Sequence, residues 1–168
     1  MVSRLLKILM LIALAAAAGC TSSPRYRSHG SAPKSTVGVG DKSVEVGGKD
    51  VIEKAQDYLG TPYRMGGTTT NGLDCSGLVY TVYRSFGITV PRTSADQSRF
   101  GAEVGRYDLQ PGDLVFFRTS SGSKVSHVGI YSGSGEFIHA STRSKRVKFD
   151  RLDNKYFKKR YVTARRVL

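Results

Sequence analysis

The apolar residues of segment 50–168 change from helical spacing to short β-forming runs, and this order limits the fold more than any other feature. The spacing predicts three helices, over 50–59, over 75–86, and a short one that begins at Ser94. Asp50 and Ser94 are each followed three residues later by Glu or Gln, which is the capping-box spacing of a helix start. The first half of this segment is therefore expected to be helical.

The second half contains short segments rich in β-forming residues and separated by turn residues, at 113–118, 125–132, 136–141, 146–150 and 161–167. The turn Ser132-Gly133-Ser134-Gly135 predicts a hairpin that places the strands of His127 and His139 side by side and antiparallel. Helices followed by strands indicate an α+β domain. We expect N-terminal helices packed on an antiparallel sheet of about five to six short strands.

The N-terminus has the features of an export signal. Arg4 and Lys7 precede an apolar run over 8–18, whose 11 residues are too few to span a bilayer comfortably as a permanent helix. The run ends in Ala17-Ala18-Gly19-Cys20, which is similar to a bacterial lipobox and implies that Cys20 becomes the lipidated first residue of the mature protein. The alternative is an ordinary cleaved signal that happens to contain a cysteine.

These features divide the chain into a lipoprotein-type signal peptide (1–19), a lipidated flexible tether (20–49) and one domain (50–168). The tether is rich in Ser and Gly and lacks apolar periodicity. Three acyl chains would anchor the protein to a membrane permanently. Thr21 follows the lipobox, and resemblance to Gram-negative lipoproteins then implies the periplasmic face of the outer membrane.

The chain is strongly basic, with a formal net charge of +13. Segment 141–168 holds 11 Lys and Arg against two Asp, a net of +9. Such a segment can bind nucleic acid, but the export signal argues against that partner. Outside the inner membrane the available anions are lipid head groups and peptidoglycan carboxylates. The basic segment either raises affinity for these anions or is simply a solvated surface.

Cys75 stands where the second predicted helix begins, and apart from Cys20 it is the only cysteine. If Cys20 is lipidated, no intramolecular disulfide can form, and a lone thiol in an oxidising compartment is expected to have a chemical role. The helix dipole and the free N–H groups of the first turn favour thiolate, as would a nearby imidazolium. The alternative is a small buried hydrophobe at a helix start.

His127 and His139 lie on the two strands of the predicted hairpin. His127 is the candidate base that takes the thiol proton. His139 would accept a hydrogen bond from the far ring nitrogen of His127 and so fix the tautomer and orientation of that ring. A buried histidine with only a structural role is the alternative for His139. The thiol and the histidines lack the Cys-x-x-Cys or His-x-x-x-His spacing of a zinc site, so we expect no metal and no cofactor.

Five motifs in order resemble the NlpC family of bacterial cell-wall peptidases: Gly60-Thr61-Pro62-Tyr63, Asp74-Cys75-Ser76-Gly77, Pro111 to Phe117, Ser126 to Tyr131, and Ile138-His139-Ala140. The resemblance covers essentially all of 50–168. It implies a papain-like fold with Cys75 as nucleophile, His127 as base and His139 as the third member. It also places Tyr63 beside the nucleophile, where its hydroxyl would bind the oxyanion or the substrate, unless Tyr63 is a packing residue.

Asp74 and Ser76 flank the nucleophile. Each would either cap the helix or face the groove and bind the amino end of a substrate peptide; capping is favoured for Asp74, and Ser76 stays open. The segment that contains Arg92 also resembles the family, and a capped helix start is a sufficient account of it.

The resemblance implies a peptidoglycan endopeptidase that cuts an amide bond of the stem peptide or cross-link, typically between D-glutamate and diaminopimelate. The alternatives are a wall-binding lipoprotein scaffold without turnover, or an amidase or acyl transferase on the same fold. We expect a monomer that acts on peptidoglycan stem peptides and is anchored to the membrane at Cys20. A regulatory lipoprotein is a further candidate partner.

Overall fold

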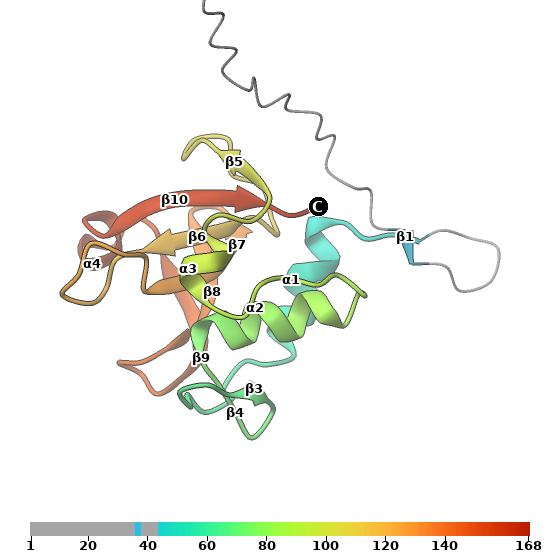
Figure 1. Cartoon of the computed structure of the whole chain (residues 1–168), viewed down its shortest axis with the longest axis horizontal. Helices are drawn as coiled ribbons and strands as arrows, with labels where there is room; N and C mark the ends of the chain where they lie inside the picture. Colours follow the sequence, from blue (N-terminus) through green and yellow to red (C-terminus); the bar gives the residue numbers. More distant parts are fainter. Residues whose placement is uncertain (1–35, 38–43) are drawn as a thin grey trace, which may run out of the picture.

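The computed structural model describes residues 36–37 and 44–168 (Figure 1). The signal peptide, Cys20 and most of the tether lie outside the described residues. The helices are α1 (Gly48–Gln56), α2 (Cys75–Arg84), α3 (Ser94–Gln97) and α4 (Lys155–Lys158). Within the described residues, no helix combines the length and the apolar character needed to cross a membrane.

Six strands form one antiparallel sheet in the order β5-β10-β6-β7-β8-β9. Their bounds are β5 (Ala102–Val104), β6 (Leu114–Phe117), β7 (His127–Gly133), β8 (Glu136–Ser141), β9 (Arg146–Arg151) and β10 (Tyr161–Arg166). Two small hairpins lie apart from it, β1 (Thr36–Val37) with β2 (Val44–Glu45), and β3 (Thr68–Thr69) with β4 (Gly72–Leu73). The predicted α+β class and antiparallel sheet are confirmed.

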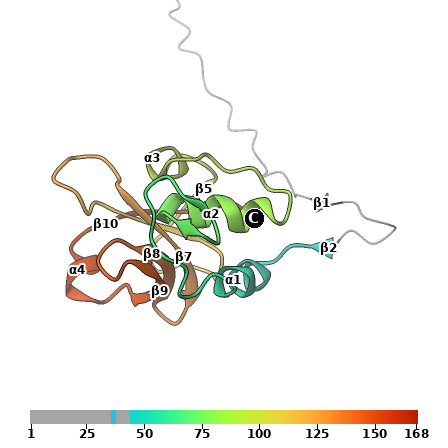
Figure 2. The same cartoon turned by 90° about the horizontal axis from the view of Figure 1, so that it is seen from below.

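Helices α1 and α2 pack against each other and against one face of the sheet (Figures 1 and 2). Their apolar faces meet alternate sheet residues in the main core, which includes Leu78, Val82, Phe116 and Ile130. A second cluster on the opposite face joins Phe117 and Phe137 to Phe157 of α4 and to other side chains. Strand β6 is buried on both faces, which accounts for its unbroken apolar sequence.

The predicted helix starts need correction. The first helix begins at Gly48 rather than Asp50, and Asp50 accepts a 2.7 Å hydrogen bond from the backbone N–H of Gly47. A carboxylate within the first turn satisfies a free N–H there as well as a capping side chain does. The third helix is capped by Thr93, whose hydroxyl accepts from the backbone N–H of Asp96. For the third helix the sequence contained two neighbouring hydroxyls, Thr93 and Ser94, and the chain path selected Thr93.

The end of the first helix was also placed too late. Helix α1 stops at Gln56, and the Leu59 side chain, predicted to share the apolar face, is 44% exposed. The residues that follow turn away to reach an isolated pairing of Pro62 with β9. This path carries residue 63 toward the start of α2.

Candidate active site

Cys75 is the first residue of α2 and is 8% exposed. Asp74 caps the helix by accepting a 2.6 Å hydrogen bond from the backbone N–H of Gly77. The backbone N–H of Val128 in β7 donates to the Cys75 sulfur. Strand β7 therefore lies directly against the thiol, and Val128 is the residue after His127.

Burial decides the protonation of the thiol. It raises the pKa of Cys75 to about 11, and the hydrogen bond from Val128 only partly opposes this increase. The expectation that a helix start would favour thiolate at rest is therefore wrong for the free protein, because loss of water around the sulfur outweighs the helix N-terminus. The thiol is protonated at neutral pH and needs a base when it reacts.

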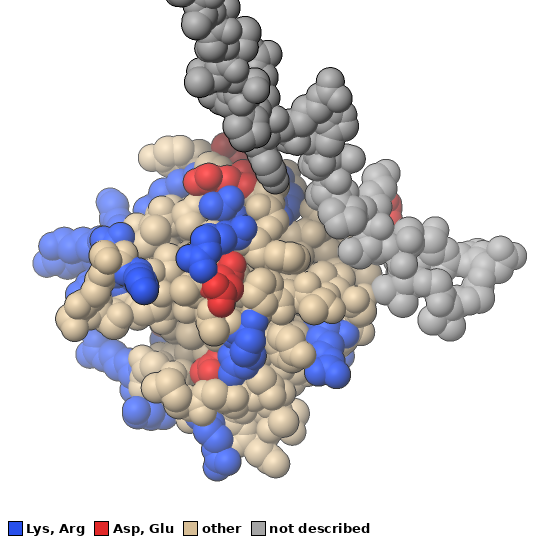
Figure 3. All heavy atoms as spheres, viewed as in Figure 1, with Lys and Arg blue, Asp and Glu red and all other residues tan. Residues whose placement is uncertain are grey.

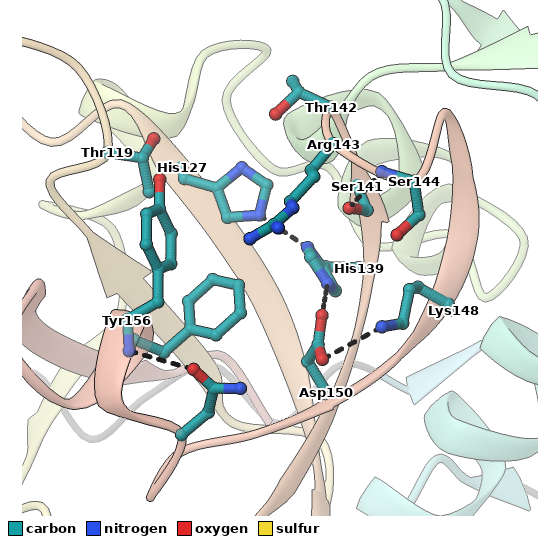
Figure 4. A pocket seen from close by; sticks show the side chains of 12 residues that line it. Thr119, His127, His139, Ser141, Thr142, Arg143, Ser144, Lys148, Asp150 and Tyr156 are labelled. Atoms are coloured by element: carbon teal, nitrogen blue, oxygen red, sulfur yellow. Dashed lines mark hydrogen bonds and ion pairs between the residues drawn. The ribbon is translucent and has the colours of Figure 1, made fainter.

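His127 and His139 form a hydrogen bond across the β7–β8 hairpin. Ile130 faces Ile138 in this pair, so the two histidines lie on one face, two positions apart. The Nε2 atom of His127 lies 2.7 Å from Nδ1 of His139. The Nε2 atom of His139 lies 3.0 Å from the Asp150 carboxylate on β9, which also accepts a bond from Lys148 (Figure 4).

This chain of bonds sets the tautomer of both rings. The Asp150 carboxylate can only accept, so Nε2 of His139 carries the hydrogen and its Nδ1 is an acceptor. His127 must then donate from Nε2, which leaves Nδ1 of His127 unprotonated. Burial, with a smaller contribution from the neighbouring His139, lowers the pKa of His127 to about 3. His127 is thus a neutral imidazole at neutral pH, with its free lone pair on Nδ1.

Tyr63 lies in the loop between α1 and β3 and is partly buried. Burial raises the pKa of Tyr63, and negative charge on Cys75 or Asp74 would raise it further. Tyr63 also pairs with Leu73, two residues before Cys75. The tyrosine packs against the core cluster that includes Cys75, and its hydroxyl is protonated at neutral pH and able to donate.

Asp74 forms a cluster with Ser76 and Arg92. The Asp74 carboxylate and the Arg92 guanidinium make two hydrogen bonds, of 3.0 and 2.7 Å. The Ser76 hydroxyl donates to Asp74 at 3.0 Å and accepts from Arg92 at 2.9 Å. Although burial opposes it, the bond from Arg92 helps to lower the pKa of Asp74. Asp74 is therefore both the helix cap and an ion-pair partner, and Ser76 is bound within the same cluster.

Sequence reasoning missed Arg92 and Asp150. Arg92 is 18 positions from Asp74, and no local pattern connects them. Asp150 was counted only as a charge in the basic segment. Pairing of His139 with Lys148 across β8 and β9 brings it to the site, and the predicted strands 136–141 and 146–150 would have pointed to it had their register been known.

Gly77 allows the start of α2 to approach the loop before β3. A Cβ at this position would lie 2.0 Å from the backbone carbonyl oxygen of Gly67.

Within the described residues, no group of three or more His, Cys, Asp or Glu side chains is arranged to hold a metal.

Gly77→Ala is expected to lower the free energy of unfolding by about 1 to 3 kcal/mol, although alanine is the better helix former, because the backbone must move to admit the methyl group. Urea denaturation measures the change. Gly122→Ala is the matched control, since a Cβ there meets nothing within 4 Å. Equal stability of Gly77→Ala and the parent chain would contradict the tight approach.

Comparisons of sequence and of structure with known proteins point to the same protein family. Residues 60–166 match the NlpC/P60 family. The probable endopeptidase NlpC of Escherichia coli K12 is 41% identical over 160 residues, which cover 95% of this chain and 97% of that protein. The murein DD-endopeptidase/murein LD-carboxypeptidase MepS of the same strain is 45% identical over 119 residues, covering 70% of this chain and 62% of MepS.

Solved structures show the same fold. A Bacillus cereus protein of the NlpC/P60 family superimposes with a TM-score of 0.70 at 40% identity, covering 73% of this chain and 41% of that chain. The NlpC/p60 domain of the peptidoglycan hydrolase SagA superimposes with a TM-score of 0.63 at 30% identity, covering 72% of this chain and 99% of that domain.

Proposed function

This chain belongs to the NlpC/P60 family, and we propose that it is a peptidoglycan endopeptidase that cuts an amide bond of the stem peptide or cross-link with Cys75 as nucleophile. Relatives named endopeptidases and murein DD-endopeptidases support the reaction class and the peptidoglycan substrate. The observation that carries the assignment of residues is the hydrogen-bonded series His127–His139–Asp150, together with the next residue of β7, Val128, whose backbone N–H donates to the buried thiol.

In the first step the sulfur of Cys75 attacks the amide carbon while Nδ1 of His127 takes the thiol proton. Neither group is charged beforehand, so the proton moves as the S–C bond forms. The carbonyl oxygen becomes an oxyanion, for which the backbone N–H of Cys75 and the Tyr63 hydroxyl are the proposed donors. The new imidazolium keeps its Nε2–H bond to His139, which is held in turn by Asp150.

In the second step the C–N bond breaks, and His127 gives its proton to the leaving amine. The remaining acyl group is a thioester on Cys75. Water then enters, His127 takes one of its protons, and the hydroxide adds to the thioester carbon. Collapse of this intermediate returns the proton to the sulfur and releases a carboxylic acid. One water molecule is consumed, and the protein returns to its starting state.

The test of this function is mass spectrometry of purified muropeptides incubated with the full chain in detergent. Cleavage within the stem peptide or cross-link is expected, and the fragment masses identify the bond. Products separated at the sugar–peptide linkage would instead indicate an amidase. Binding of muropeptides without any cleavage, by protein shown to be folded, would favour a wall-binding scaffold.

Asp150→Ala is expected to lower kcat about 100-fold, because His139 loses the acceptor that fixes its tautomer and therefore that of His127. Asp150→Asn should retain more activity, since its amide oxygen can still accept from His139. Steady-state hydrolysis of a stem-peptide substrate measures both. Asp153→Ala removes an exposed carboxylate paired with Arg151 and serves as the control. Equal kcat values for Asp150→Ala and Asp153→Ala would exclude the positioning role.

We also propose that the protein is a lipoprotein anchored through Cys20 to the periplasmic face of the outer membrane. The basic n-region, the short apolar run and the lipobox-like end support this anchor. Incorporation of labelled palmitate into the parent chain, and its loss in Cys20→Ser, is the expected result. Label in Cys20→Ser at the parent level would contradict it.

A surface rich in Lys and Arg would favour binding to the anionic lipids and peptidoglycan of a cell envelope. Lys and Arg side chains gather on the side of the molecule where α4 and the start of β10 lie (Figure 3). The described residues of this side include exposed Arg118, Lys155, Lys158 and Lys159. We propose that this surface raises local affinity for wall or lipid anions, an effect that added salt would weaken.

A further inference from the structure

A pocket of about 310 Å³ lies beside the two histidines, on the side that Cys75 does not line. His127 and His139 form one wall, and the loop between β8 and β9 forms another (Figure 4). Tyr156 and Phe157 of α4 close a further side. Apart from His127 and His139, the residues that line this pocket lie outside the motifs identified in the sequence.

The proposed mechanism determines which half of the substrate can reach this pocket. The acyl half stays bound to the sulfur of Cys75, beside Tyr63 and the Asp74 cluster. The other half leaves as an amine that takes its proton from His127, so it must lie against that ring. A pocket that has His127 in its wall is therefore positioned to receive the released segment.

The charged side chains that line the pocket favour binding of an anion. Lys148 is paired with Asp150 at 3.0 Å, so these two charges offset each other. Arg143 projects from the β8–β9 loop toward the histidines, and no ion pair or side-chain hydrogen bond to it is found among the described residues (Figure 4). Hydroxyl groups of Ser141 and Ser144 line the same wall. A guanidinium with hydroxyl neighbours is suited to a carboxylate.

We propose that this pocket binds the released segment and that Arg143 recognises a free carboxylate on the residue that supplies the leaving amine. The inference rests on the proposed function, because that function assigns the side on which the amine leaves. Diaminopimelate residues of stem peptides carry such a second carboxylate. Arg143 then determines specificity for a substrate charge and takes no part in the bond-breaking steps.

The test compares two synthetic stem peptides that differ only at the released residue, one with diaminopimelate and one with its side-chain carboxamide. The full chain is expected to cut the carboxylate form with a kcat/KM on the order of 10-fold higher. Arg143→Gln should remove this preference by slowing cleavage of the carboxylate form alone. Lys145→Gln, which removes a cation from the same loop outside the pocket, should keep the preference.

A binding measurement separates failure of this inference from failure of the proposed function. Calorimetry with the Cys75→Ala chain records affinity for each intact peptide without turnover. Tighter binding of the carboxylate form, lost in Cys75→Ala with Arg143→Gln, would support the pocket even if the parent chain cut neither peptide. Equal affinity for the two peptides, or an unchanged preference after Arg143→Gln, would overturn it.

Discussion

Cys75→Ala is expected to abolish muropeptide hydrolysis, with a loss in kcat of about 10⁴-fold or more. The sulfur is the only atom of the proposed site that bonds to the substrate, and no neighbouring side chain can replace it. Mass spectrometry of muropeptide digests, run beside the parent chain, measures the loss. Because the side chain is small and lies at a helix start capped by Asp74, the fold should be retained.

Cys75→Ser is the sharper companion variant. It preserves shape and the bond from Val128, but a hydroxyl is far harder to deprotonate than a thiol, so it should also be inactive. Denaturation curves close to those of the parent chain would show that both variants are folded. Residual hydrolysis by Cys75→Ala above about one part in a hundred of the parent rate would rule out this cysteine as nucleophile.

The second large effect is a loss of stability in acid. Burial holds the pKa of His127 at about 3, below its ordinary 6.5. Between these two pH values His127 is protonated in the unfolded chain and neutral in the folded chain. Stability from this group is complete above pH 6.5 and is lost as the pH falls toward 3. The expected loss across this window is about 4 kcal/mol. Burial also lowers the pKa of His139, which adds to the effect in the same direction.

Urea denaturation at a series of pH values measures this dependence. Between pH 6.5 and 4.5 the parent chain should lose about 2 to 3 kcal/mol more than His127→Gln, whose side chain does not titrate. This interval avoids the carboxyl groups Asp74 and Asp150, whose pKa values are lowered and which titrate in stronger acid. Identical pH dependence for the two chains would show that His127 is not buried as a neutral ring.

The strands that sequence reasoning located are the ones with strong local signals. Strand β8 was predicted with its observed bounds, and β6, β7, β9 and β10 within about two residues, because β-forming residues there lie between clear turns. Strand β5, the hairpins of two-residue strands and helix α4 were missed. These missed elements of two to four residues have too few side chains to display a period. Strand β6 and helix α3 are as short, but an adjacent turn and the capping-box spacing located them.

The active-site residues divide in the same way. A turn between His127 and His139 is a short-range feature, and so is an acidic residue before the helix at Cys75, so both arrangements could be predicted. The contacts of Arg92 with Asp74, and of Asp150 with His139, depend on how separate elements pack. Pairing across 18 residues, or across a hairpin whose register is unknown, has no signal in a single sequence.

The sequence by itself located the residues of the proposed active site: a thiol at a helix start, two histidines on adjacent strands, and the motifs that connect them. Only the tertiary structure decided their protonation. Helix dipoles act over the first turn of one element, and on that ground alone Cys75 was expected to be a thiolate. The solvation of its sulfur depends on strand β7 and the core packed around it, and burial raises its pKa to about 11. Desolvation is a property of the packed molecule, and for this reason the proposed mechanism has His127 take the thiol proton during the attack.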